Sequence, residues 1–60
     1  MAIDVLIAED EPGILDALGF ILVRDGWTIS SVTDGESVLG AVRRLNPRML
    51  ILDLMLPRRN

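Results

Sequence analysis

The sequence predicts an α/β fold with three parallel strands and two helices in the order βαβαβ. Short apolar runs alternate with segments whose apolar residues recur at helical spacing. The first and last of these runs are continuously apolar, as in parallel strands covered on both faces. Sixty residues have room for one small domain at most. We therefore expect residues 1–60 to form one unit in which helical crossovers join neighbouring parallel strands.

The first half of the chain predicts a strand, a helix and a second strand. Residues 3–8, IDVLIA, form the first apolar run, and the acidic EDE and then PG follow at once. Proline after acidic residues is typical of a helix N-terminus, so we expect a helix over roughly residues 14–24. It should end at Asp25-Gly26, because glycine adopts the left-handed conformation that ends helices. The second strand is expected at 27–32, WTISSV.

The second half predicts a turn, a helix and a third strand. Asp34-Gly35 reads as a turn. Residues 36–45 then carry an apolar stripe at helical spacing, made of Val38, Leu39, Ala41, Val42 and Leu45. Asn46-Pro47 should end this helix. The third strand is expected within residues 49–57, MLILDLMLP, a run too short and too evenly apolar for a surface helix.

Size and composition predict a partner subunit. The chain is 50% hydrophobic and has neither cysteine nor histidine, so neither a disulfide nor a structural zinc can support so small a core. In strand order 2-1-3 the third strand would be an unpaired edge. The first helix carries apolar residues nearly all round, with Phe20 and Val23 outside its main stripe. We expect a homodimer through the third strand and the first helix.

Several function classes are disfavoured. The net charge is −3 and no basic run exceeds a pair, which argues against a nucleic-acid-binding face. No apolar stretch reaches the length of a membrane span and no signal-peptide pattern is present, so a cytoplasmic location is expected. The glycines do not form a dinucleotide-binding motif, and a chain without histidine or cysteine lacks the usual triads. No self-contained enzyme is predicted.

Acidic residues at two strand ends predict a binding site. Asp53 lies in an otherwise apolar run, where a charge needs solvent, an ion-pair partner or a cation. Glu9, Asp10 and Glu11 follow the first strand. Ligands bind beyond the carboxyl ends of parallel strands, so we expect Asp10 and Asp53 to converge. Such a cluster raises carboxyl pKa values or shares a hard cation, and oxygen donors favour Mg²⁺ over zinc. Helix capping and a solvent-facing aspartate are the plainer alternatives.

Three motifs, VLIAEDEP, TDGESVL and LILDLMLP, resemble the receiver domain of two-component response regulators. The resemblance covers nearly the whole chain but only the first half of that family's flavodoxin-like (βα)5 fold. It implies that Glu9 and Asp10 are the acidic pair of a Mg²⁺ site. It also implies that Asp53 accepts a phosphoryl group from a histidine kinase, and that the backbone carbonyl of Met55 completes the metal shell.

The resemblance also predicts a departure from the family. Receivers read the phosphoryl group with a Ser or Thr after the fourth strand and a Lys after the fifth, and we expect both to be missing from these 60 residues, which contain no lysine. Two hypotheses stay open: a truncated receiver that keeps phosphoacceptor chemistry, or a self-associating structural half-domain with a vestigial acidic site. A haloacid-dehalogenase-type phosphatase is disfavoured, because Met55 stands where that class needs a second aspartate.

Overall fold

The predicted order of elements is confirmed. A computed structural model describes residues 3–53 of the chain. In chain order the elements are β1 (Val5–Glu9), α1 (Pro12–Arg24), β2 (Ile29–Val32), α2 (Glu36–Leu45) and β3 (Met49–Asp53). They form the βαβαβ unit that the sequence pattern predicted, which is half of the flavodoxin-like sheet that the resemblance to receivers implied.

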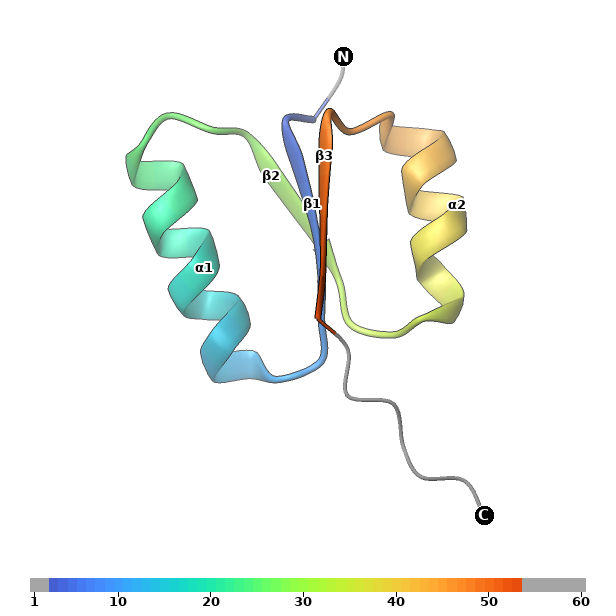
Figure 1. The fold of residues 1–60 in the computed structure, drawn as a ribbon, viewed down its shortest axis with the longest axis horizontal. Coiled ribbons are helices and arrows are strands. Elements are labelled where there is room, and N and C mark those ends of the chain that lie inside the picture. Colours follow the sequence, from blue (N-terminus) through green and yellow to red (C-terminus); the bar gives the residue numbers. More distant parts are fainter. Residues whose placement is uncertain (1–2, 54–60) are drawn as a thin grey trace.

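The sheet has the predicted order β2-β1-β3, and both strand pairs are parallel. Val5 of β1 lies opposite Ile29 of β2 and Met49 of β3, and Glu9 lies opposite Asp53. The helices flank opposite faces of the sheet, with α1 on one side and α2 on the other (Figure 1). Because all strands run the same way, β1 and β3 end at the same edge, which is also the edge where α1 begins.

Helix ends follow the local sequence signals. Pro12 is the first residue of α1, two residues before the predicted start, since proline needs no hydrogen bond for its nitrogen there. After Arg24 the chain turns at Gly26, whose φ of 96° is accessible to glycine and costly for other residues. Asn46 closes α2 in the left-handed region with φ 51°, and its N–H donates to the carbonyl of Val42.

β1 and β2 each begin two residues later than predicted, because side-chain hydrogen bonds replace the sheet ladder just before them, while β3 begins at Met49 as predicted. The Asp4 N–H donates to Oγ1 of Thr28, and the Thr28 N–H and hydroxyl both donate to Oδ2 of Asp4. The Asp4 carbonyl accepts N–H groups from Arg48 and Met49, and the Arg48 guanidinium lies 3.9 Å from Oδ1 of Asp4. Asp4 therefore joins the starts of all three strands.

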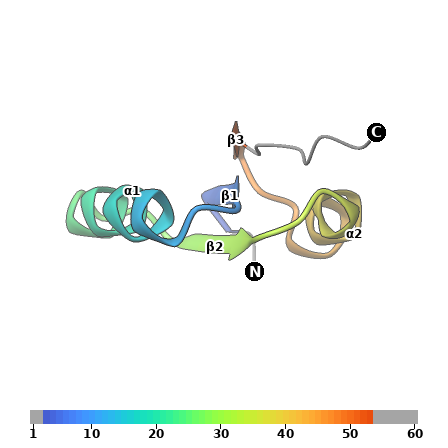
Figure 2. The same cartoon turned by 90° about the horizontal axis from the view of Figure 1, so that it is seen from below.

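The core is concentrated on β1. Its apolar residues Val5, Leu6, Ile7 and Ala8 are buried, and the other fully buried apolar residue of the described chain is Ala41 in α2. Both helices contact β1 and β2. Figure 2 shows β3 standing clear of them at one side of the sheet. Central position, rather than apolar sequence alone, decides which strand is covered.

Two apolar segments are open within the described residues. The all-round apolar surface of α1 was expected to be covered by a partner subunit, which stays a prediction, and in the single chain none of its residues is fully buried and Phe20 and Val23 are well exposed. The apolar run at 49–52 was expected to be covered on both faces, yet Leu50 is 41% exposed. The reason is geometric, since within residues 3–53 both helices pack against β1 and β2 and neither contacts β3.

Candidate functional site

The acidic residues of β1 and β3 meet at the carboxyl edge of the sheet. Glu9 ends β1 and Asp53 ends β3, and the parallel register places the two residues opposite each other. Together with Glu11, Gly13 and Ile14 they line a hollow of about 390 Å³ at the start of α1. The strand-end position predicted from the sequence is therefore observed for both carboxylates.

Glu9 is the buried member of this site. The residue is 1% exposed, and Oε2 of its side chain accepts a hydrogen bond of 3.0 Å from the backbone N–H of Glu11. Its other oxygen, Oε1, is buried and has no hydrogen-bond partner among the described residues. A buried carboxylate oxygen without a partner is unfavourable, because it has lost water and gained nothing in exchange.

Burial raises the pKa of the Glu9 carboxyl above its ordinary value of 4.5. The N–H of Glu11 acts in the opposite direction, while the nearby carboxyl of Asp53 and the negative charge of Asp10 raise the pKa further. Close carboxylates repel, so ionising all of them is costly unless a cation or a proton is shared. The electrostatics of the site therefore favour a positive charge beside Glu9 and Asp53.

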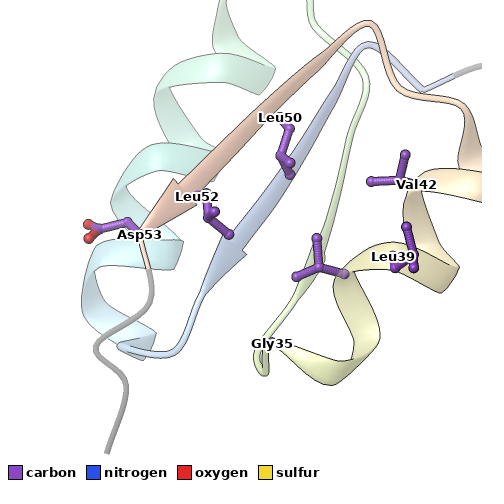
Figure 3. A pocket seen from close by; sticks show the side chains of 7 residues that line it. Gly35, Leu39, Val42, Leu50, Leu52 and Asp53 are labelled. Carbon is purple, nitrogen blue, oxygen red and sulfur yellow. The ribbon is translucent and has the colours of Figure 1, made fainter.

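Asp53 is the accessible member of the site. Its residue is exposed, and it lies between the acidic hollow and a second, apolar one. In Figure 3 its carboxyl group points away from the side on which Leu50 and Leu52 project toward α2. This alternation is that of a β-strand, in which successive side chains take opposite faces. The carboxylate can therefore be approached from solvent while the strand holds its backbone in place.

Asp10 lies next to this pair without lining the hollow. It is exposed and raises the pKa of Glu9 through its charge. Within residues 3–53 no three histidine, cysteine, aspartate or glutamate side chains are grouped closely enough to hold a metal ion. The predicted convergence of Asp10 and Asp53 stays a prediction. Met55, the fourth predicted ligand, lies outside the described residues.

The part played by Glu11 does not follow from the sequence. Glu11 was expected only as a member of the acidic run, but its backbone N–H donates to one oxygen of Glu9 and holds it in place. Gly13 and Ile14, which line the hollow, were not singled out either. Pro12 was the available signal, because a helix that begins there directs the preceding N–H groups toward the end of β1.

Two carboxylates at this edge supply oxygen donors of the kind that a hard divalent cation prefers. Glu9 Oε1 supplies an unsatisfied buried oxygen, and Asp53 supplies an exposed carboxylate opposite it. Mg²⁺ prefers such oxygen ligands and keeps several waters, so it does not need a closed protein cage. Glu9 and Asp53 are a partial donor set, because within residues 3–53 no third histidine, cysteine or acidic side chain is grouped with them.

Comparison with known proteins decides the family. The sequence matches the response regulator receiver domain over residues 5–60. The chain belongs to the response regulator receiver family. This receiver sequence is 38% identical over 55 residues to the probable transcriptional regulatory protein TcrX of Mycobacterium tuberculosis, covering 92% of the chain and 24% of that protein. No solved structure gave a significant match.

Two further relatives are response regulators or sensory transduction proteins by name. The DNA-binding response regulator MtrA of Mycolicibacterium smegmatis is 38% identical over 56 residues, covering 93% of the receiver chain and 25% of MtrA. The sensory transduction protein RegX3 of Mycobacterium bovis is 43% identical over 53 residues, covering 88% of the chain and 23% of RegX3. The chain thus spans about a quarter of the length of these relatives. In residues 3–53 neither helix is long and apolar enough to cross a bilayer.

Proposed function

We propose that this receiver chain takes part in two-component signalling by accepting a phosphoryl group on Asp53 from a histidine kinase. The observation that carries the proposal is the parallel register that sets the exposed Asp53 opposite the buried Glu9, whose Oε1 lacks a partner. An accessible carboxylate beside a site that favours a cation has both requirements of a phosphoacceptor.

The chemistry follows from the positions of these groups. A carboxylate oxygen of Asp53 attacks the phosphorus in line, the new O–P bond forms, and the N–P bond to the donor histidine breaks. The imidazole leaves with the electron pair and takes up a proton. Mg²⁺, when bound, offsets charge on the transferred phosphoryl oxygens. Glu9 and Asp10 would hold it, with the carbonyl of Met55 as the further ligand expected from the family.

Phosphorylation can be tested directly on the 60-residue chain. We expect incubation with acetyl phosphate and MgCl₂ to add the mass of one phosphoryl group, measured promptly by intact mass spectrometry because acyl phosphates hydrolyse. Asp53→Asn should abolish the gain. Asp34→Asn, which changes an acid in the turn before α2, is the matched control and should keep it. A phosphoryl group that persists on the Asp53→Asn protein would refute the assignment.

Metal binding has its own measurement. Mg²⁺ that binds the folded state alone stabilises it by mass action, so millimolar MgCl₂ should raise the Tm of the chain. The shift should shrink in Asp53→Asn and in Asp10→Asn and should persist in Asp34→Asn. An unchanged Tm at saturating Mg²⁺ would contradict an assembled site.

We further propose that the chain by itself holds the phosphoryl group without reading it. The family's readout uses a lysine, and these 60 residues contain none. Amide hydrogen exchange of α2 and β2 should then be the same before and after phosphorylation, while amides next to Asp53 change. A change that spreads through α2 would show a readout of another kind.

Self-association is the second candidate role, as a structural half-domain with a vestigial acidic site. It is favoured by the apolar surface of the third strand and the first helix, where Leu52 is 61% and Phe20 67% exposed. The homodimer expected through these two elements remains a proposal, tested by light-scattering mass. A dimer that never gains a phosphoryl group on Asp53 would leave this structural role alone.

A further inference from the structure

The two carboxylate oxygens of Glu9 are in different situations. Oε2 accepts a 3.0 Å hydrogen bond from the backbone N–H of Glu11, while Oε1 is buried and has no partner among the described residues. The residue is 1% exposed, so Oε1 has almost no access to water either. The chain therefore holds one oxygen in place and leaves the other to a group that it does not itself supply.

The start of α1 explains why one oxygen is satisfied and the other is not. Glu11 directly precedes the helix in an extended conformation, with φ −100° and ψ 113°, so its N–H takes no part in the helical hydrogen bonds. The next nitrogen belongs to Pro12, the first residue of α1, and carries no hydrogen. At these two positions the backbone can donate one hydrogen bond to Glu9, and it does so to Oε2.

The anchored carboxyl group of Glu9 lies beside that of Asp53. The two residues are register partners and line the same hollow of about 390 Å³. Their carboxyl groups are close enough for Asp53 to raise the pKa of Glu9 both as a hydrogen-bond acceptor and as a charge. A glutamate side chain has several rotatable bonds, and ordering it costs conformational entropy. A fixed hydrogen bond to Oε2 meets that cost before any ligand arrives.

The side chain of Glu11 takes no part in this anchor. The donor is the backbone nitrogen, and the residue itself is exposed at the rim of the hollow. Any residue with an N–H at this position can make the same hydrogen bond, so the third acid of the EDE run contributes through its backbone.

We propose that the backbone N–H of Glu11 is a positioning group of the phosphoacceptor site, holding Oε2 of Glu9 so that Oε1 is turned toward Asp53, where one divalent cation can contact both carboxylates. The inference rests on the proposed phosphorylation of Asp53 and adds the group that orders its neighbour. Removing a hydrogen bond to a metal ligand typically weakens metal binding by about 10- to 100-fold.

Replacing the N–H with an oxygen atom tests the donor. A chain of 60 residues is within reach of chemical synthesis, so Glu11 can be replaced by its α-hydroxy acid, which keeps the side chain and converts the N–H into an ester oxygen. The Mg²⁺ dissociation constant, measured by calorimetry, should rise about tenfold or more. The same ester at Glu36 is the matched control and should leave the constant unchanged. Glu36 also begins a helix, and within residues 3–53 its N–H has no hydrogen-bond partner.

Two substitutions separate positioning from a general effect on the start of the helix. Glu11→Gln keeps the N–H and should bind Mg²⁺ as wild type does. In the Glu9→Gln background the side chain is neutral and a poor cation ligand, so the Glu11 ester should change the dissociation constant by less than about twofold. A general effect on the start of α1 would weaken binding equally in both backgrounds. Circular dichroism without Mg²⁺ checks that each chain is folded.

A measurement on the unmodified chain covers the case in which the ester does not fold. With ¹³C in the Glu9 carboxyl group, addition of MgCl₂ should shift this carbon and the Glu11 amide proton with the same dissociation constant. A Glu11 amide proton that does not respond would overturn the proposal, because its acceptor would then be unaffected by the cation.

Failure of this inference can be told apart from failure of the proposed function. If the chain binds Mg²⁺ and gains a phosphoryl group on Asp53, but the Glu11 ester binds Mg²⁺ as tightly as wild type, phosphorylation stands and the positioning role fails. Equal weakening by the Glu36 ester, or undiminished weakening in Glu9→Gln, would overturn it as well. If the unmodified chain binds no Mg²⁺, the positioning role fails, and phosphorylation is judged by the intact mass.

Discussion

β1 and β3 are both five-residue, mostly apolar strands, yet β1 is buried and β3 is largely exposed. Leu6 of β1 is 0% exposed, while Leu50, its register partner in β3, is 41% exposed. β1 has a strand on each side and a helix on each face, whereas the neighbour of β3 among residues 3–53 is β1 alone. An apolar run therefore indicates that a strand can be buried, and the position of the strand in the sheet decides whether it is.

The largest effect should come from truncating this register pair. Leu6→Ala removes buried methyl groups and leaves a cavity, so we expect a loss of about 2–5 kcal/mol in the free energy of unfolding. That is enough to unfold most of a chain this small. Leu50→Ala should cost about 1 kcal/mol or less, because its side chain already contacts solvent. Urea denaturation at low protein concentration measures both, and equal losses would contradict the difference in burial.

The acidic residues at the two ends of β1 have pKa values shifted in opposite directions. At the start, hydrogen bonds from the Thr28 N–H and hydroxyl lower the pKa of Asp4 below its ordinary 3.8. The adjacent Arg48 lowers it further. At the end, burial raises the pKa of Glu9. The fold therefore gains from the charge at one end of the strand and is opposed by the charge at the other.

Asp4→Asn should give the next largest loss of stability, because Asp4 joins the starts of all three strands. The folded state holds the Asp4 proton less tightly than the unfolded state does. Its contribution is thus present above the unfolded pKa near 3.8 and is lost as the pH falls through the lower folded value. The Tm difference between wild type and Asp4→Asn should be full at pH 7 and shrink below pH 3.8. Asp25→Asn, at the same edge of the sheet, is the control and should change the Tm much less.

Glu9→Gln should change the pH dependence of stability in the opposite direction to Asp4→Asn. The folded state holds the Glu9 proton more tightly than the unfolded state, so stability falls as the pH rises from 4.5 through the raised folded value. The neutral variant lacks this fall, and its Tm at pH 7 without Mg²⁺ should exceed that of wild type by a few degrees. Glu11→Gln keeps the backbone N–H that holds Glu9 and should be nearly neutral. A lower Tm for Glu9→Gln would show that the buried carboxylate has a partner that stabilises it.

Sequence patterns predicted the arrangement of this receiver better than its burial. Alternating apolar periods predicted the elements, and the order 2-1-3 was taken as the usual one for the fold. The strand ends located Glu9 and Asp53, because these positions follow from local spacing and from the common direction of parallel strands. The exposure of Phe20 and Leu50 depends on which strands each helix covers, and this tertiary arrangement cannot be read from the sequence pattern. Likewise, the link between Glu9 and the Glu11 N–H depends on where α1 begins relative to β1.

The smallest expected effect is a difference in amide hydrogen exchange between the two edges of β3. The Met49 N–H donates to the Asp4 carbonyl just before β1, so by the alternation along a strand the Ile51 N–H also faces β1, while those of Leu50 and Leu52 face away from it. In a dilute, monomeric sample Ile51 should exchange its amide hydrogen slowly and the two leucines quickly, giving alternating protection along one strand. In β1, which has a strand on each side, Leu6 and Ile7 should both be protected. At concentrations where the proposed dimer forms, the leucine amides should slow to match Ile51, because pairing through β3 gives them partners. Alternation that persists in a dimer would place its interface elsewhere than the β3 edge.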